Sequence, residues 1–252
     1  MGERTGSFAV AMAAIAFAAL AFAGGSAGPL GAETAAKSRP VAPESSTAGE
    51  ILPAPPEHPD PTKRYLFYLH GRIVEDAGPR PSNELFGTYE YPEILDRMAA
   101  AGFVVISEQR APATDPATYS ERVAEQVKTL LAAGVPAERI TVSGFSKGGG
   151  IAVLTSARLA EPRVNFVFMG ACAGGPPDPK IHVSGYVLTI HEDSDRIASP
   201  CGPLLEQAGE VPAKRAITIH TGRGHGAFWQ PRDEWLGPLL EWARTAGGRD
   251  PE

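Results

Sequence analysis

The sequence lacks the concentrated positive charge that nucleic-acid-binding proteins need. Its 23 Lys and Arg are outnumbered by 29 Asp and Glu, so the formal net charge is -6 at pH 7. The basic residues are scattered along the chain, whereas a surface that binds a phosphate backbone gathers Lys and Arg in one place. We therefore expect no nucleic acid among the partners of this protein.

Long apolar runs are also missing, apart from one at the N-terminus. That run extends from Phe8 to Ala23, follows Arg4 and precedes small residues, which is the pattern of an export signal. It is shorter than a membrane-spanning helix usually needs, and its alanines favour insertion weakly. We expect residues 1–23 to be a signal peptide, with cleavage as late as about residue 32. A retained membrane anchor is the alternative.

Cysteine is scarce, with only two residues, Cys172 and Cys201, in a chain of 252. An export signal places the mature protein in the periplasm or the extracellular space, without stable membrane insertion. In such an oxidising compartment a pair of cysteines favours a disulfide over two free thiols. Two small buried thiols are the alternative.

Residues able to bury apolar area are rare from about Glu33 to Thr62, where Pro, Ala, Glu, Ser and Thr dominate. Such a composition is typical of a linker or an extended arm. The sequence therefore predicts three parts. They are the signal peptide, a Pro- and Ala-rich linker or arm over residues 24–62, and a folded domain over residues 63–252.

In the folded domain, short apolar runs alternate with longer helix-like segments, and there is no internal repeat. The runs are nearly continuous in apolar residues, which suits parallel strands covered on both faces. The pattern predicts an α/β fold with a mostly parallel sheet of about six strands and helices on both faces. The predicted strands are Tyr65–Leu69, Phe103–Ser107, Ile140–Ser143, Asn165–Met169, Tyr186–Ile190 and Ala216–His220. The predicted helices are Pro92–Ala101, Tyr119–Ala133, Lys147–Ala160 and Asp233–Arg244.

A serine stands between two glycines where the predicted strand Ile140–Ser143 meets the next helix. Gly144 and Gly148 allow strand and helix to approach closely, while Ser146 is held in a strained turn with its hydroxyl outward. The pattern alone is weak in a chain with 28 glycines, and its place between strand and helix strengthens it. A phosphate-binding loop needs a Lys followed by Ser or Thr after its last glycine, and here Lys147 follows the serine.

This turn resembles the nucleophile elbow of the α/β-hydrolase fold family, in its serine hydrolase or esterase-like form. His70-Gly71, directly after the first strand, resembles the family's oxyanion segment. Asp195 and then His225 follow the serine in the family's order of nucleophile, acid and histidine. The resemblance covers roughly residues 63–244. The connection of residues 170–185 is too short for a helical lid, so the resemblance implies a minimal cap.

The resemblance also implies roles for particular residues. Ser146 needs a base to remove its proton, and His225 lies in a glycine-flanked loop after the last strand, where the family places its catalytic histidine. His220 is the alternative base. Asp195 would orient the histidine, with Asp193 as the alternative acid.

Two backbone N–H groups would bind the oxyanion of the intermediate. The resemblance assigns them to Lys147 and Arg72, with Ile73 as the alternative to Arg72. A bridge between Cys172 and Cys201 would brace the loop that carries the acid.

The sequence thus predicts an exported serine hydrolase that cleaves an ester or related acyl bond of a small-molecule substrate without a cofactor. A non-catalytic binding protein that keeps the same fold is the alternative. A metal hydrolase is disfavoured because its candidate ligands lack a recognised spacing. Those ligands would be His191, Glu192, Asp193 and Asp195. No residue pattern specifies the substrate or the oligomeric state.

Overall fold

The computed structural model describes residues 49–208 and 211–247, so the predicted signal peptide and residues 24–48 of the predicted linker lie outside the described residues. Within these ranges the chain forms one sheet of seven strands, in which every neighbouring pair is parallel. The predicted α/β class is therefore confirmed. In spatial order the strands are β1 (Ile51–Leu52), β5 (Val104–Ile106), β2 (Tyr65–Leu69), β6 (Ile140–Phe145), β7 (Asn165–Met169), β8 (Tyr186–Glu192) and β9 (Ala213–Ile219).

The sheet has one strand more than predicted, because the segment assigned to the linker supplies its edge. The two residues of β1 pair with Val105 and Ile106 of β5. The N–H of Gly49 also donates to the carbonyl of Ala99, at 2.8 Å. The expectation of no strand before Tyr65 is wrong, since a two-residue strand is too short to show a periodic apolar pattern.

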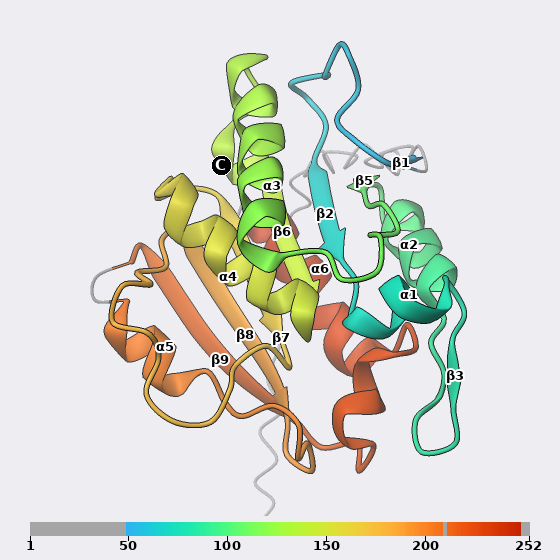
Figure 1. Cartoon of the computed structure of the whole chain (residues 1–252). Helices are drawn as coiled ribbons and strands as arrows, with labels where there is room; N and C mark the ends of the chain where they lie inside the picture. The colour runs from blue at the N-terminus through green and yellow to red at the C-terminus, as the bar shows by residue number, and fades with distance from the viewer. Residues whose placement is uncertain (1–48, 209–210, 248–252) are drawn as a thin grey trace, which may run out of the picture. The chain divides into compact units, whose positions relative to one another are not determined.

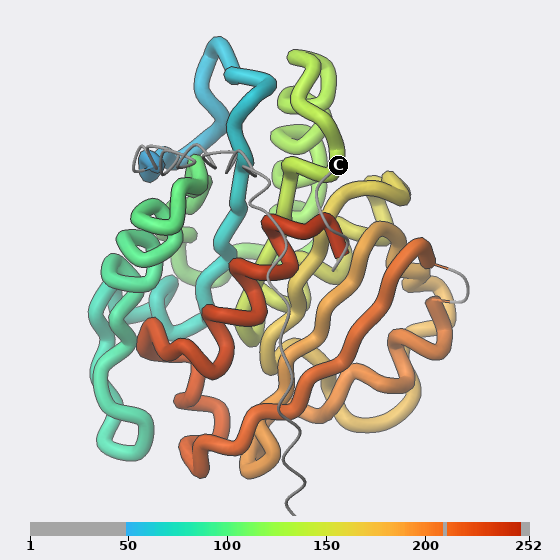
Figure 2. Tube along the Cα trace, turned by 180° about the vertical axis from the view of Figure 1, so that it is seen from behind, coloured from blue at the N-terminus to red at the C-terminus, as the bar shows by residue number. Residues whose placement is uncertain are grey.

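Six helices accompany the sheet in the described ranges. They are α1 (Arg72–Ala77), α2 (Tyr91–Ala100), α3 (Pro116–Ala132), α4 (Lys147–Leu159), α5 (Gly202–Gln207) and α6 (Asp233–Thr245). Figure 1 shows α3 and α4 in front of the strands, and the view from behind in Figure 2 shows α2 and α6 across the other face. None of the helices in these ranges is long and apolar enough to span a membrane. The sequence did not predict α1, α5 or a short hairpin of β3 (Ser82–Asn83) and β4 (Gly87–Thr88).

Each central strand supplies side chains to two hydrophobic cores, one on each face of the sheet. In β2, Leu66 and Tyr68 belong to the core under α2 and α6, and the other three residues belong to the core under α3 and α4. Successive side chains of a strand point to opposite faces, so burial of all five requires cover on both. This arrangement explains why the sequence of the strand is apolar throughout.

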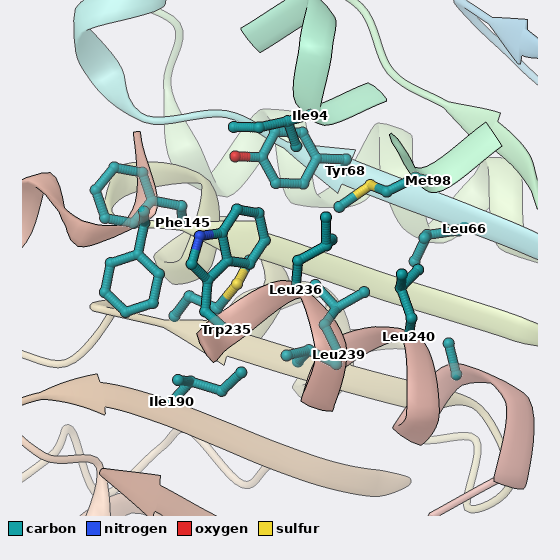
Figure 3. Packing of buried hydrophobic residues seen from close by; sticks show 14 of the residues in the cluster. Leu66, Tyr68, Ile94, Met98, Phe145, Ile190, Trp235, Leu236, Leu239 and Leu240 are labelled. Carbon is teal, nitrogen blue, oxygen red and sulfur yellow. The ribbon is translucent and has the colours of Figure 1, made fainter. Parts of the chain in front are cut away.

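Helix α6 closes the second core with an apolar stripe. Figure 3 shows its side chains lying among those of Leu66 and Tyr68 from β2 and of Ile190 from β8. Full burial of one such side chain stabilises the folded state by about 1.5–3 kcal/mol. The stripe consists of Trp235, Leu236, Leu239 and Leu240, of which the first three are fully buried.

The carboxyl ends of the parallel strands meet at one edge of the sheet, which is where open α/β sheets bind ligands. His70 follows β2, Ser146 follows β6, Asp193 follows β8 and His220 follows β9. A short 3-10 helix, η2 (Gly224–Phe228), lies beyond β9. The residues singled out in the sequence therefore come from segments that leave the same edge.

Candidate active site

Ser146 occupies a strained turn between β6 and α4. Its backbone has φ 53° and ψ -121°, a combination that non-glycine residues seldom adopt. Glycines on both sides are required by space: a Cβ on Gly148 would lie 1.9 Å from the carbonyl oxygen of Leu69, and one on Gly144 would lie 2.2 Å from that of Gly148. The strand and the helix therefore approach so closely that only glycine fits, and the turn projects the serine from the strand end.

The hydroxyl of Ser146 lies in a hydrogen-bonded row with His225 and Asp195. His225 Nε2 is 2.9 Å from Ser146 Oγ, and His225 Nδ1 is 2.7 Å from Asp195 Oδ2. Since the carboxylate accepts, Nδ1 carries the ring proton and Nε2 is free to accept the hydroxyl proton. The three side chains come from three segments separated by 49 and 30 positions in the chain.

The carboxylate of Asp195 is held by the loop that carries it. Its Oδ1 accepts hydrogen bonds from the N–H groups of Ile197 and Ala198, at 2.8 and 3.1 Å. Burial by itself would raise the pKa of Asp195, but the hydrogen bonds from His225 and from these two N–H groups outweigh it and lower the pKa. The side chain therefore stays ionised at neutral pH although it is fully buried.

The alternative base and the alternative acid pair with each other, away from the serine. His220 Nδ1 lies 2.6 Å from Asp193 Oδ2, and the two side chains are 70% and 46% exposed. The structure thus does not bring either residue to Ser146. Asp193 and Asp195 are only two positions apart, and the turn between them sends their side chains to different histidines.

The four residues considered as metal ligands have separate environments. Glu192 is buried and accepts hydrogen bonds from the N–H groups of Ser194, Thr221 and Gly222. Burial would raise its pKa, but the hydrogen bonds from Ser194 and Thr221 lower it to about 2. In the part of the chain that the structure describes, no three His, Cys, Asp or Glu side chains gather in a way that could hold a metal ion.

The two predicted oxyanion donors are the first residues of two helices. Arg72 begins α1 and Lys147 begins α4, directly after Gly71 and Ser146 respectively. The N–H groups of a first helical turn have no partner within the helix, so both can donate to a ligand. The side chain of Arg72 is exposed and bonds Asp76 at 3.2 Å. Ile73, the alternative donor, is the second residue of α1.

Comparisons with solved structures show which fold this chain shares. A putative dienelactone hydrolase from Klebsiella pneumoniae is 14% identical and superposes with a TM-score of 0.50, over 75% of this chain and 90% of that chain. The chain has the α/β-hydrolase fold. The protein XC6422 from Xanthomonas campestris, described as an α/β serine hydrolase without a lid, is 17% identical over 75% of this chain and 84% of its own, with a TM-score of 0.47. SOBER1 of Arabidopsis thaliana is 13% identical over 72% of this chain and 98% of its own, with a TM-score of 0.48.

At these identities the likeness concerns the α/β-hydrolase fold and not an activity. No protein-family model matches the sequence, and no curated protein matches it. The connection between β7 and β8, residues 170–185, is described throughout and contains no helix. This α/β-hydrolase fold therefore has the minimal cap that the short connection predicted.

Sequence reasoning missed a buried cluster of charges in this α/β-hydrolase fold. His70 Nε2 accepts a hydrogen bond from the N–H of Arg110 at 2.9 Å, while its Nδ1 donates to the carbonyl of Gly71 at 2.8 Å. Burial, aided by the nearby guanidinium of Arg110, lowers the pKa of His70 to about 3, so the ring is neutral. Arg110 also bonds Glu75, and no spacing in the sequence links residues 35 positions apart. Glu75 directly after the apolar pair Ile73-Val74 was the available signal.

Two hollows flank the elbow of the α/β-hydrolase fold. One, of about 420 Å³, has mostly apolar walls that include Lys147, Ala171 and Leu204. The disulfide between Cys172 and Cys201 lies in its wall, so the structure has the bridge and not two free thiols. The other, of about 790 Å³, includes His225 and runs between the hairpin and the loops after β8 and β9. The first hollow thus reaches the elbow at Lys147, and the second reaches it at His225.

Proposed function

We propose that this protein is an exported serine hydrolase that cleaves an ester or a related acyl bond through an acyl-enzyme on Ser146. The observation that carries the proposal is the continuous hydrogen-bonded row from Ser146 through His225 to Asp195. A serine hydroxyl is a poor nucleophile at neutral pH unless a base removes its proton as it attacks. The row supplies such a base and a carboxylate to orient it.

The reaction would begin with attack of Ser146 Oγ on the substrate carbonyl carbon as His225 Nε2 takes the hydroxyl proton. Asp195 keeps the imidazole in the required tautomer and stabilises the imidazolium. The carbonyl oxygen, now negatively charged, accepts hydrogen bonds from the N–H groups of Lys147 and Arg72. Each such donor lowers the barrier by about 3 to 4 kcal/mol in comparable enzymes.

Breakdown of the tetrahedral intermediate would release the leaving group. The imidazolium of His225 donates its proton to the leaving oxygen, the bond to the acyl carbon breaks, and the acyl group stays on Ser146. A water molecule then attacks the acyl carbon as His225 takes one of its protons. The bond between the acyl carbon and Ser146 Oγ breaks, His225 returns that proton to the serine, and the carboxylic acid leaves. Small-molecule acyl compounds are therefore the expected substrates, with no cofactor.

Two further observations support parts of this proposal. The Klebsiella protein with the same fold carries the name of a hydrolase, which agrees with hydrolysis. The disulfide agrees with export, since structural disulfides persist in oxidising compartments. Export itself is tested by N-terminal sequencing of the protein from the medium or the periplasm, which should begin between about residues 24 and 33 if the signal is cleaved.

The nucleophile is tested with a fluorophosphonate probe and an activated ester. The wild type should be labelled on one residue and should hydrolyse the ester, and Ser146→Ala should lose both properties. Ser82→Ala, which changes an exposed hairpin serine, is the matched control and should keep both. Absence of labelling in folded wild-type protein, together with saturable binding of an ester, would instead favour the non-catalytic binding protein.

A further inference from the structure

A buried carboxylate joins the two helix starts that carry the candidate oxyanion donors. Glu75, on α1, is fully buried; its Oε1 accepts from Arg110 Nε at 2.7 Å and its Oε2 accepts from Lys147 Nζ at 2.5 Å. The side chain of Arg110 is fully buried and that of Lys147 is 18% exposed. The mechanism described above uses none of these three side chains.

The contacts of this cluster converge on the oxyanion segment. Lys147 is the first residue of α4, and Glu75 lies in the first turn of α1, which begins at Arg72. Arg110 in addition donates to the carbonyl oxygen of His70. The cluster therefore holds residues 70–75 against the elbow from two directions, through one carboxylate.

Stability alone does not account for such a cluster. Buried ion pairs are often replaced by apolar side chains without loss of stability, because desolvation of the charges offsets their attraction. Geometry offers a reason: oxyanion donors act only when both are about 3 Å from the developing charge. Displacement of one by about 1 Å can lower the rate by about 100-fold.

We propose that Glu75 is a positioning residue that sets the distance between the Lys147 and Arg72 N–H groups by binding Lys147 and Arg110 at once. This inference rests on the proposed function. The cluster also holds two cations against one anion, so its net charge of +1 favours negative charge on the substrate in the transition state. Glu75 acts through other groups and does not touch the reacting atoms.

The test is Glu75→Gln, which keeps the size of the side chain but replaces one acceptor oxygen with a donor NH₂. One of the two cations then loses its partner, and the spacing of the donors relaxes. We expect kcat to fall by about 100-fold while KM stays within about twofold. The affinity for a boronic acid that forms a tetrahedral adduct with Ser146 should fall with kcat/KM, while the affinity for the product acid should not.

A purely structural role would give a different result. The melting temperature would fall, but kcat per fluorophosphonate-titrated site and boronic acid affinity would stay at the wild-type values; that result would overturn the proposal. Lys147→Met keeps the Arg110–Glu75 pair and serves if Glu75→Gln does not fold; here kcat should fall by about tenfold. Glu138→Gln breaks the partly exposed pair with Arg163 and should leave kcat unchanged. If the wild type is not labelled at all, the proposed function fails and not this inference alone.

A second, independent observation concerns the hollow beside His225. Its lining includes Arg196 and Arg223 and no acidic residue. Neither guanidinium has an ion-pair partner among residues 49–208 and 211–247. Leu85 and Ile197, which are 79% and 64% exposed, belong to the same lining. The hollow thus offers apolar contact and two positive charges that have no ion-pair partner in the described part of the chain.

The chemistry assigns this hollow to the leaving group. His225 must reach the leaving oxygen to protonate it, so the leaving group lies on the histidine side of Ser146. We infer that the substrate is an ester or thioester whose leaving group carries a carboxylate or another anionic group, bound by Arg196 and Arg223. This inference also rests on the proposed function.

This inference is tested with two phenyl acetates. One carries a carboxylate on the phenol ring, and the other carries a carboxamide at the same ring position. The wild type should prefer the carboxylate by about tenfold in kcat/KM, since a hydrogen bond between two charged groups is stronger than one to a neutral amide. The preference should disappear in Arg196→Gln, Arg223→Gln and weaken with rising salt. Equal rates for both esters in a wild type that is labelled on Ser146 would overturn this inference and leave the proposed function intact.

Discussion

His225 and His220 each hold an aspartate at almost the same distance, yet the two pairs differ in every other respect. The ring nitrogen lies 2.7 Å from Asp195 in one pair and 2.6 Å from Asp193 in the other. In the first pair the side chains of His225 and Asp195 are 9% and 0% exposed. In the second pair those of His220 and Asp193 are 70% and 46% exposed. The second ring nitrogen of His225 has a further partner, the hydroxyl of Ser146.

The comparison teaches that the length of a hydrogen bond does not distinguish the buried pair beside Ser146 from the exposed pair. An exposed ion pair contributes less than about 1 kcal/mol, because water competes for both groups and salt screens them. A buried carboxylate that already accepts two backbone N–H groups cannot rotate to another partner, so it fixes the ring that it accepts from. Asp195 is held in this way and Asp193 is not.

The largest effect is expected from Asp195→Asn. The amide cannot hold the required tautomer of His225, so kcat should fall by about 10⁴-fold with the fold intact. Steady-state kinetics on an activated ester, with circular dichroism as the check on folding, measure this. A loss of less than tenfold would mean that Asp195 does not orient the base.

A smaller effect is expected from loss of the disulfide. Cys172 and Cys201 are 29 positions apart, and the carbonyl of Cys172 accepts from the N–H of Ser199 in the loop beyond Asp195. In the double variant Cys172→Ala, Cys201→Ala, the free energy of unfolding should fall by about 3 to 4 kcal/mol. Urea denaturation measures this loss.

Hydrogen exchange in the same double variant shows whether the disulfide supports the pair of His225 and Asp195 more than the pair of His220 and Asp193. The N–H groups of Ile197 and Ala198, which hold Asp195, should exchange their hydrogens faster, whereas the N–H of Thr221 beside His220 should not change. Equal acceleration at both places would show that the bridge stabilises the whole domain and not the acid loop. Wild-type protein treated with a reductant should behave like the variant.

The contribution of Glu192, which precedes both aspartates, to the free energy of unfolding depends on pH. Its pKa of about 2 lies below the ordinary value of 4.5, so its contribution is fully present above pH 4.5 and is lost as the pH falls towards 2. The shift corresponds to about 3 kcal/mol. Urea unfolding of the wild type should therefore weaken between pH 4.5 and 2 by more than that of Glu192→Gln. Parallel curves for the two proteins would contradict the assigned hydrogen bonds.

The smallest effect is expected from the exposed pair. Asp193→Asn and His220→Gln should each leave kcat within about twofold and the free energy of unfolding within about 1 kcal/mol, because both side chains are largely solvated. The kinetic assay used for Asp195→Asn measures both. A large loss in Asp193→Asn would reverse the roles of the two aspartates.

The sequence by itself determined the α/β class, most of the strands and the position of the serine turn. Strands covered on both faces must be apolar throughout, and a turn with no room for a Cβ must use glycine, so these features are visible in local sequence. The edge strand β1 and the short helices α1 and α5 were not visible, because two to six residues are too few to show a period.

Only the tertiary structure showed that His225 and Asp195, and not His220 and Asp193, lie in a hydrogen-bonded row with Ser146, and that Cys172 and Cys201 form a disulfide. It also revealed Glu75, whose partners lie 35 and 72 positions away in the chain. Local patterns report which face of an element is buried. They do not report which side chains from distant segments meet, because that depends on how the sheet aligns the ends of its strands.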